Sequence, residues 1–299
     1  MLRRVIDDPS IEKMLRDPED VMDLVLDAGK PPVIHFRNDT PVAMACEPLS
    51  SETVHRLVSL LPKMTQDRCY LPERPTDRIA VIRGYDGMPT GISWRFASAT
   101  VPHLPEAVQT YLEAPDAGSV LVFGRPGCGK TTVLRSMIRC CADTARYRVM
   151  VVDPYGEMGL PQNSMARHMM LYPGSSTETL MEQAIRYHSP EVLVVDEIVT
   201  RNESRAALHA GLRGIRLLAS CHARSVSDLI HHPVMRDLVG NTQSAAISDS
   251  ASKQRGSKFV TERRQLPLFQ AAYDVERDMF MWDLKSEIDS LLNSKSYIS

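Results

Sequence analysis

The sequence predicts an α/β protein in which a domain with a mostly parallel β-sheet follows a small α+β domain. From residue 119 onward, short apolar strands alternate with segments of helix length, a pattern typical of parallel sheets covered by helices. Before residue 114 the chain instead mixes a helical pattern with a hairpin pattern. A chain of 299 residues is long enough for two such domains.

We expect the first domain to span residues 1–114. A helix is predicted by the apolar stripe Val54, Leu57, Val58, Leu60 and Leu61. Two apolar runs, 79–82 and 92–96, flank the turn-rich segment 84–87 and predict a hairpin. Prolines between residues 102 and 118 place the domain boundary in that segment, within which residues 107–112 fit a short helix.

The second domain is expected over residues 115–276, followed by a short helical tail at 277–299. Its apolar runs predict strands at residues 120–123, 149–152, 169–171, 192–195 and 215–219. Two later stretches, 244–247 and 268–275, are candidates for additional strands at one edge of the sheet.

Bulk composition excludes several classes of protein. With 35 Lys and Arg against 37 Asp and Glu, the net charge of −2 gives no global basic field for tight nonspecific nucleic-acid binding, although a local basic patch stays open. No apolar run reaches the roughly 20 residues of a membrane span. Six scattered cysteines without a Cys-x-x-Cys pair fit a reducing compartment. We expect a soluble protein of the cytoplasm or of an organelle interior such as the plastid stroma, without membrane insertion.

Residues 124–131, Gly-Arg-Pro-Gly-Cys-Gly-Lys-Thr, match the phosphate-loop pattern G-x-x-x-x-G-K-[ST] between an apolar strand and a helical segment. In such a loop, backbone N–H groups surround phosphate oxygens, Lys130 reaches the β- and γ-phosphates, and the Thr131 hydroxyl ligates Mg²⁺. The pattern predicts binding of ATP with Mg²⁺, and we interpret Cys128 as a small filler rather than a redox switch. The residues expected at the nucleotide are Gly124, Arg125, Pro126, Gly127, Cys128, Gly129, Lys130, Thr131 and Thr132.

A second apolar run, residues 192–195, is followed by Asp196 and Glu197. Where a strand tip meets a phosphate loop, the first carboxylate, Asp196, is expected to hold the magnesium through a water. The second, Glu197, is expected to orient or deprotonate the attacking water. The alternative is a strand end with solvated acids.

Two further strands end in polar residues. The run 149–152 leads to Asp153 and Glu157, which either add a second water-positioning carboxylate or only cap a loop. The run 215–219 leads to His222, which either contacts the γ-phosphate and relays its loss or has a structural role. Both alternatives stay open from the residues alone.

Together these motifs resemble the plastid open-reading-frame P-loop ATPases and their bacterial relatives, which include stage III sporulation protein AA. The resemblance runs from about residue 11 to residue 275. It is carried by residues 27–32, 77–83, 124–132, 151–157, 190–198, 220–223, 233–240 and 255–263. The family is in turn similar to the traffic ATPases of type II and type IV secretion, whose acidic and histidine segments correspond to the regions of Glu157 and His222.

This resemblance implies a RecA-like P-loop NTPase core, assembly into a homo-oligomeric ring, with a hexamer as one candidate, and a protein client. The chain departs from the family pattern at Val199, where glycine is usual, and at residues 220–223, which leaves the geometry around His222 open. Only residues 276–299 follow the core. That tail is too short for the C-terminal nucleic-acid-binding module of some relatives.

We expect an ATP-hydrolysing motor or switch that acts on a partner assembly. The alternatives are a nucleotide-dependent module that binds single-stranded nucleic acid, supported by the basic stretch 253–264, and a nucleotide-stabilised scaffold with little turnover. Arg255 and Arg263 are candidates for a catalytic arginine that reaches a neighbouring subunit's nucleotide. Equally, they fit surface ion pairs with Asp249 or Glu262.

Overall fold

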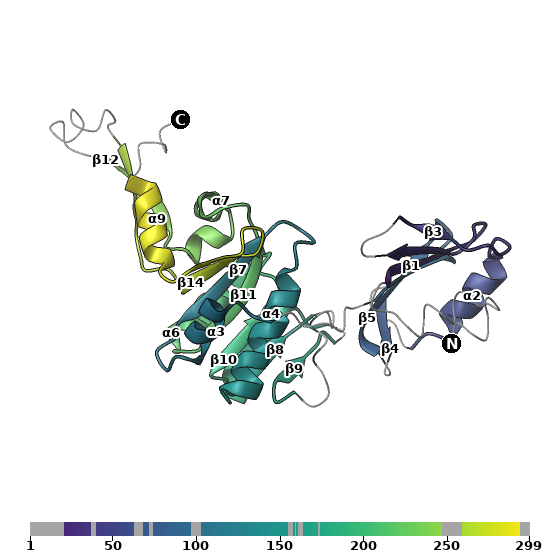
Figure 1. Ribbon diagram of the computed structural model, residues 1–299, viewed down its shortest axis with the longest axis horizontal. Helices are drawn as coiled ribbons and strands as arrows, with labels where there is room; N and C mark the ends of the chain where they lie inside the picture. Colours follow the sequence, from purple (N-terminus) through teal and green to yellow (C-terminus); the bar gives the residue numbers. More distant parts are fainter. Residues whose placement is uncertain are drawn as a thin grey trace. The chain divides into compact units, whose positions relative to one another are not determined.

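The computed structural model describes residues 21–36, 40–62, 68–71, 74–96, 103–154, 158, 160, 164–172, 174–246 and 259–293. The chain divides into two compact units (Figure 1), one built from residues up to Val101 and the other from nearly all residues after it. The division therefore falls at the start of the proline-containing segment that we expected to hold the boundary. Helix α3, which we expected in the first domain, belongs to the second unit.

In its described residues, the first unit is an antiparallel sheet in the order β3-β2-β1-β6-β5-β4 with helix α2 packed on it. Its elements are β1 (Val21–Asp27), β2 (Val33–Phe36), β3 (Val42–Ala43), α2 (Ser51–Ser59), β4 (Arg68–Leu71), β5 (Arg74–Arg83) and β6 (Pro89–Arg95). The predicted helix and hairpin are both confirmed. Helix α2 begins where the Ser50 hydroxyl accepts the Thr53 N–H at 3.1 Å, and it buries Val54 and Leu57.

Polar side chains of this first sheet are fixed across strands. Asp77 is fully buried, and its carboxylate accepts the indole N–H of Trp94 at 3.0 Å. Arg95 donates to both carboxylate oxygens of Asp23 at 2.7 and 3.2 Å. These pairs join neighbouring strands and have a structural role.

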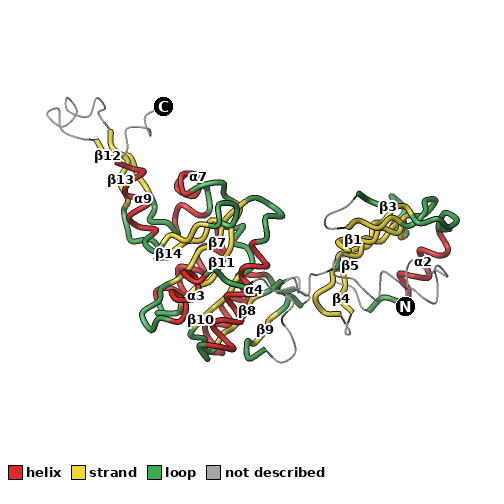
Figure 2. Tube along the Cα trace, viewed as in Figure 1, coloured by secondary structure: helices red, strands yellow, loops and turns green. Residues whose placement is uncertain are grey.

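The second unit contains the predicted parallel sheet, in the order β15-β14-β7-β11-β10-β8-β9. Only the β14–β15 pair is antiparallel. The strands are β7 (Ser119–Gly124), β8 (Val149–Val152), β9 (Arg167–Met169), β10 (Val192–Val195), β11 (Arg216–His222), β14 (Phe269–Asp274) and β15 (Met279–Met281). Every residue of β7, β8 and β10 is buried, because helices cover both faces of the sheet (Figure 2).

The helical elements of this unit alternate with its strands, as the sequence predicted. They are α3 (Glu106–Glu113), α4 (Lys130–Arg139), α5 (Thr177–Gln183), α6 (Arg201–Leu212), α7 (Val226–His231) and α9 (Leu284–Asn293), with short turns η2 (Cys140–Thr144), η3 (Ala184–His188) and η4 (Met235–Asp237). Among the described residues, no helix has the length and apolar character that a membrane crossing requires.

Three expectations for the last part of the chain need correction. The stretch 244–247 falls largely in β12 (Thr242–Ala246), which pairs with β13 (Phe259–Arg263) in a separate two-stranded sheet. The stretch 268–275 gives β14, but β14 is flanked on both sides, by β7 and β15. The expected helical tail contains strand β15, and α9 buries Leu284 and Ile288 in the main core, so it is part of the second unit's core.

Candidate functional site

The phosphate loop joins β7 to α4, and its glycines are required by its shape. Gly129 precedes the first residue of α4 with φ of +101°, a conformation that L-residues with a side chain rarely adopt. A Cβ atom at Gly124 would lie 2.5 Å from the Cys128 sulfur, so the loop closes on itself only because glycine stands there. Cys128 is half-buried and lies against this glycine, and its interpretation as a small filler stays a prediction.

Lys130 points into the loop that precedes it. Its side chain is buried, with the residue 6% exposed, and Nζ donates to the carbonyl oxygens of Gly124 at 3.1 Å and Arg125 at 2.9 Å. A third contact, at 2.8 Å, joins Nζ to Nδ1 of His222. The two carbonyl acceptors are neutral, so anionic phosphate oxygens are stronger partners for this cation.

Thr131 and Asp196 meet beside this lysine. The Thr131 hydroxyl donates to the Asp196 carboxylate at 3.0 Å, while the Ser220 hydroxyl donates to the Asp196 carbonyl and fixes the tip of β10. A hydroxyl and a carboxylate fit Mg²⁺, which takes few protein oxygens and completes its octahedron with water and substrate phosphates. The described residues hold no cluster of three or more His, Cys, Asp or Glu side chains suited to a metal ion.

His222 connects the lysine to Glu197. In the parallel register of β11 and β7, His222 lies opposite Gly124, which brings its ring to the loop. Its Nε2 lies 3.0 Å from Oε1 of Glu197, so Lys130, His222 and Glu197 form one continuous chain. Burial raises the pKa of the neighbouring Cys221 thiol to about 12, which keeps that thiol protonated at neutral pH.

Asp153, at the end of β8, has a different environment. It is fully buried, and its carboxylate lies 2.9 Å from Nε2 of His168, a residue of β9. This contact ties β8 to β9 and favours the loop-capping interpretation of Asp153. Glu157 and Arg255 lie outside the described residues.

Arg263 binds an acid of the C-terminal helix. Its Nε and Nη2 donate to the two carboxylate oxygens of Asp289 at 3.0 and 2.9 Å, and its side chain is 12% exposed. These hydrogen bonds hold the pKa of Asp289 below its usual value. Among the described side chains, Arg263 therefore has an ion-pair partner, Asp289 of α9, that was not one of the surface acids we considered.

Two further residues at this edge were not predicted from the sequence. Glu276 and Arg277 lie in the turn between β14 and β15. Glu276 accepts the backbone N–H of Arg125 at 2.7 Å, and Arg277 donates to the carbonyl of Arg224 at 3.0 Å. The sequence did contain a signal for both residues. They follow directly after an apolar parallel strand, as the other residues of the site do.

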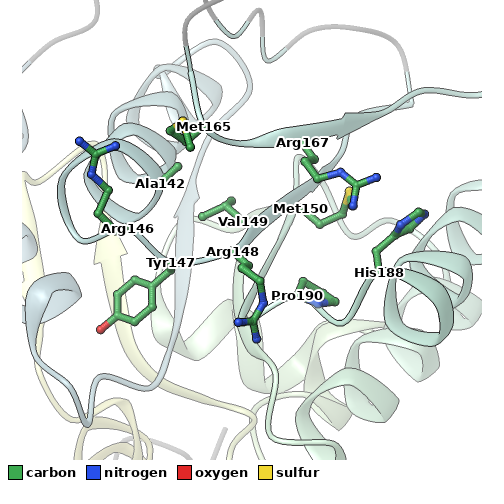
Figure 3. Close-up of a pocket in the computed structure, with 10 residues that line it drawn as sticks. All are labelled: Ala142, Arg146, Tyr147, Arg148, Val149, Met150, Met165, Arg167, His188 and Pro190. Carbon is green, nitrogen blue, oxygen red and sulfur yellow. The ribbon is translucent and has the colours of Figure 1, made fainter.

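A separate pocket of about 230 Å³ lies at the opposite edge of the sheet, where β8 and β9 begin. Its lining includes Arg146, Arg148, Arg167 and His188 around Val149 and other apolar side chains. Figure 3 shows the three guanidinium groups pointing apart rather than toward one point. The predicted nucleotide residues lie outside this lining.

Comparison with known proteins gives a family match. A family model described as sporulation stage III, protein AA, matches residues 95–253. The protein SEEDLING PLASTID DEVELOPMENT 1 of Arabidopsis thaliana is 30% identical over 86% of this chain and 38% of its own length. An uncharacterized protein, ycf45, of Porphyra purpurea is 27% identical over 92% of this chain and 49% of its own length. The chain thus spans about half, or less, of the length of these relatives.

Among solved structures, the pilus retraction motor PilT with bound ADP is similar. It aligns with 88% of this chain and 76% of its own chain at a TM-score of 0.62 and 17% sequence identity. This likeness confirms the RecA-like P-loop fold that the resemblance implied. With the family model covering more than half of the residues, the chain belongs to the sporulation stage III protein AA family.

Proposed function

We propose that this protein is a Mg²⁺-dependent ATPase that binds ATP at the phosphate loop and hydrolyses its terminal phosphoanhydride bond. One observation carries the proposal. Lys130 and Thr131 from the β7–α4 junction meet Asp196 and Glu197 from the tip of β10 at one edge of the sheet. This set supplies a phosphate-binding cation, a magnesium site and a carboxylate for water.

ATP binding would replace weak hydrogen-bond partners of Lys130 with stronger ones. The lysine amine gives up carbonyl and imidazole acceptors for the β- and γ-phosphate oxygens, with backbone N–H groups of the loop around them. Thr131 and Asp196 are the residues that would hold Mg²⁺, which neutralises charge on the phosphates when bound. No large rearrangement of these residues is needed.

Glu197 is the group that we assign to the attacking water. It is partly exposed, and its Oε1 lies 3.0 Å from Nε2 of the His222 ring, which positions the carboxylate. Because Lys130 also contacts His222, arrival of phosphate at the lysine alters the partners of the histidine. We propose His222 as the residue that links phosphate occupancy to Glu197, and keep Glu157 as the alternative water-activating carboxylate.

At the level of biology, we propose a nucleotide-driven switch or motor that works as a homo-oligomeric ring on a protein client. The likeness to a pilus retraction motor supports a motor function on this fold, and the name of one relative, SEEDLING PLASTID DEVELOPMENT 1, supports a plastid setting. The basic stretch 253–264, the support for nucleic-acid binding, lies mostly outside the described residues. We put the mechanical hypothesis first because of the likeness to a motor.

The test is ATP binding and multiple-turnover phosphate release with Mg²⁺, for wild type, Lys130→Ala and a matched control, Lys285→Ala, which removes an exposed lysine of α9. We expect binding and release by wild type and the control, and loss of binding in Lys130→Ala. A parallel titration with GTP measures base selectivity. Unchanged ATP affinity in Lys130→Ala would refute the assigned site, and binding without turnover would favour the scaffold.

A further inference from the structure

We propose that Glu276, in the turn between β14 and β15, is a positioning residue for the phosphate loop. The kinetic part of this inference rests on the proposed ATPase function, whereas its structural part does not. The residue lies beyond the stretch 95–253 that the family model matches, and it is 151 positions away from its partner in the loop.

Glu276 binds one residue of the loop in two ways. Its Oε1 accepts the backbone N–H of Arg125 at 2.7 Å, and its Oε2 lies 3.5 Å from Nε of the Arg125 side chain. A short hydrogen bond to a carboxylate is the stronger of these contacts. The ion pair is the weaker, because the Arg125 side chain is 66% exposed.

The hydrogen bond between Glu276 and Arg125 fixes the peptide group to which Lys130 is also hydrogen-bonded. The N–H of Arg125 and the carbonyl of Gly124 belong to the same planar peptide unit, in which they point in opposite directions. Glu276 binds this unit at its N–H, and Lys130 Nζ binds it at its carbonyl, at 3.1 Å. Holding the N–H therefore sets the direction of the carbonyl and, through it, the resting place of the Lys130 amine.

The turn that carries Glu276 is itself firmly built. The carboxylate of Asp274, which is 1% exposed, accepts the backbone N–H groups of Glu276 at 3.1 Å and Arg277 at 3.2 Å. The Val275 N–H donates to the Phe123 carbonyl at 3.1 Å, which extends the pairing of β14 with β7 up to the loop. Glu276 is thus presented by a fixed backbone.

The same turn also reaches the histidine segment. Arg277 binds the buried Asp274 carboxylate. It also donates to the carbonyl of Arg224 at 3.0 Å, and Arg224 lies two residues after His222. One turn therefore contacts the backbone at the start of the phosphate loop and the backbone that follows the histidine. This arrangement holds in register the two segments whose side chains meet as Lys130 and His222.

If Glu276 acts through its hydrogen bond, glutamine should keep most of its effect. Glutamine keeps a carbonyl oxygen that accepts the Arg125 N–H and removes the negative charge, whereas alanine removes both. Loss of a hydrogen bond to a charged group is expected to change an equilibrium constant about tenfold. Removing the charge also relieves repulsion of the nucleotide phosphates, so the Gln variant should bind ATP at least as well as wild type.

The experiment uses the full chain as wild type, Glu276→Gln, Glu276→Ala and Glu287→Ala, the last being a control at another acid of the C-terminal part. We expect the Arg125 amide of the nucleotide-free protein, followed by NMR, to exchange with solvent about tenfold faster in Glu276→Ala. The affinity for a fluorescent ATP analogue should fall about tenfold in that variant. The Gln variant and the Glu287→Ala control should stay near wild type in both measurements.

Wild-type exchange and affinity in Glu276→Ala would overturn the inference. Equal loss in Gln and Ala variants would also overturn it, because the charge and not the hydrogen bond would then matter. If wild type binds no nucleotide, the proposed ATPase function fails, while the amide-exchange comparison still decides the role of Glu276.

Discussion

The two larger sheets of this protein use charged side chains in different ways. In the antiparallel sheet of the first unit, Asp77 and Asp23 bind Trp94 and Arg95 across neighbouring strands, so each charge stabilises the sheet. In the parallel sheet of the second unit, charged side chains gather where β7, β10 and β11 end, and we propose that nucleotide replaces some of their present partners. The charged pairs of the first sheet thus hold strands together, whereas those at the ends of these three strands are placed where a ligand could reach them.

The largest expected effect on turnover is the loss of a catalytic arginine. Such an arginine would add a charged group from a neighbouring subunit to those at the strand ends of the parallel sheet. Because Arg263 is bound to Asp289, we now favour Arg255 for this role. We expect Arg255→Ala to lower turnover by about 10³-fold or more, the contribution of a trans-acting arginine. Mixing it with Lys130→Ala should restore activity, because one variant keeps good nucleotide sites and the other keeps the arginine. Normal turnover of Arg255→Ala alone would rule out the role, with Arg205→Ala, an exposed arginine of α6, as control.

Next in size is the carboxylate that we assign to water. Glu197→Gln should lower phosphate release by about 10²-fold while ATP binding persists, because Asp196 and Thr131 remain. Glu191→Gln is a matched control at the other end of β10, where an acid should not matter for turnover. If Glu157→Gln proves the more damaging change, water activation belongs to that residue instead.

The first unit should respond in stability rather than in rate. Asp77→Ala leaves the buried Trp94 N–H without this acceptor, which should cost about 1 to 3 kcal/mol of unfolding free energy, with turnover near that of wild type. The chain has two tryptophans, so a Trp282→Phe background makes Trp94 fluorescence report on the first unit in a urea titration. Asp86→Ala, in the exposed hairpin turn, is the control. A large fall in turnover of Asp77→Ala without loss of stability would contradict a purely structural role of this charge in the first sheet.

The smallest effect concerns Arg263, which lies in the second unit but away from the nucleotide edge. Its pair with Asp289 is partly exposed, so Arg263→Ala should cost at most about 1 kcal/mol of stability. The lowered pKa of Asp289 means that this stability is present above the unfolded pKa of about 3.9. It is lost as the pH falls through the lower folded value, so the difference between variant and wild type should shrink on acidification in urea melts. A difference that grows with acid would contradict the assignment.

Local patterns predicted much of this molecule from the sequence. The strands β7, β8, β10 and β11 appear within a few residues of their apolar runs, because a buried parallel strand is apolar throughout. Lys130 and Thr131 follow from one contiguous motif, and Asp196 with Glu197 from another.

What the sequence did not disclose depends on contacts between distant residues. The order of the strands is a matter of pairing, which periodicity does not encode, so β12 was assigned to the wrong sheet. The Glu276–Arg125 contact joins residues 151 positions apart, and the Arg263–Asp289 pair joins residues 26 positions apart. No spacing rule connects either pair, and each was visible only once the strands and helices were placed.

The position of β14 limits how far the protein can be truncated from its C-terminal side. Strand β14 covers one side of β7, the strand that leads into the phosphate loop, yet it lies beyond the segment matched by the family model. A fragment that ends near residue 253 would keep the phosphate loop, Asp196, Glu197 and His222 and still expose the backbone N–H and C=O groups along that side of β7. An open strand edge invites pairing between molecules. Recombinant fragments and inserted fusions should therefore keep the chain through α9, even where only the nucleotide motifs are of interest.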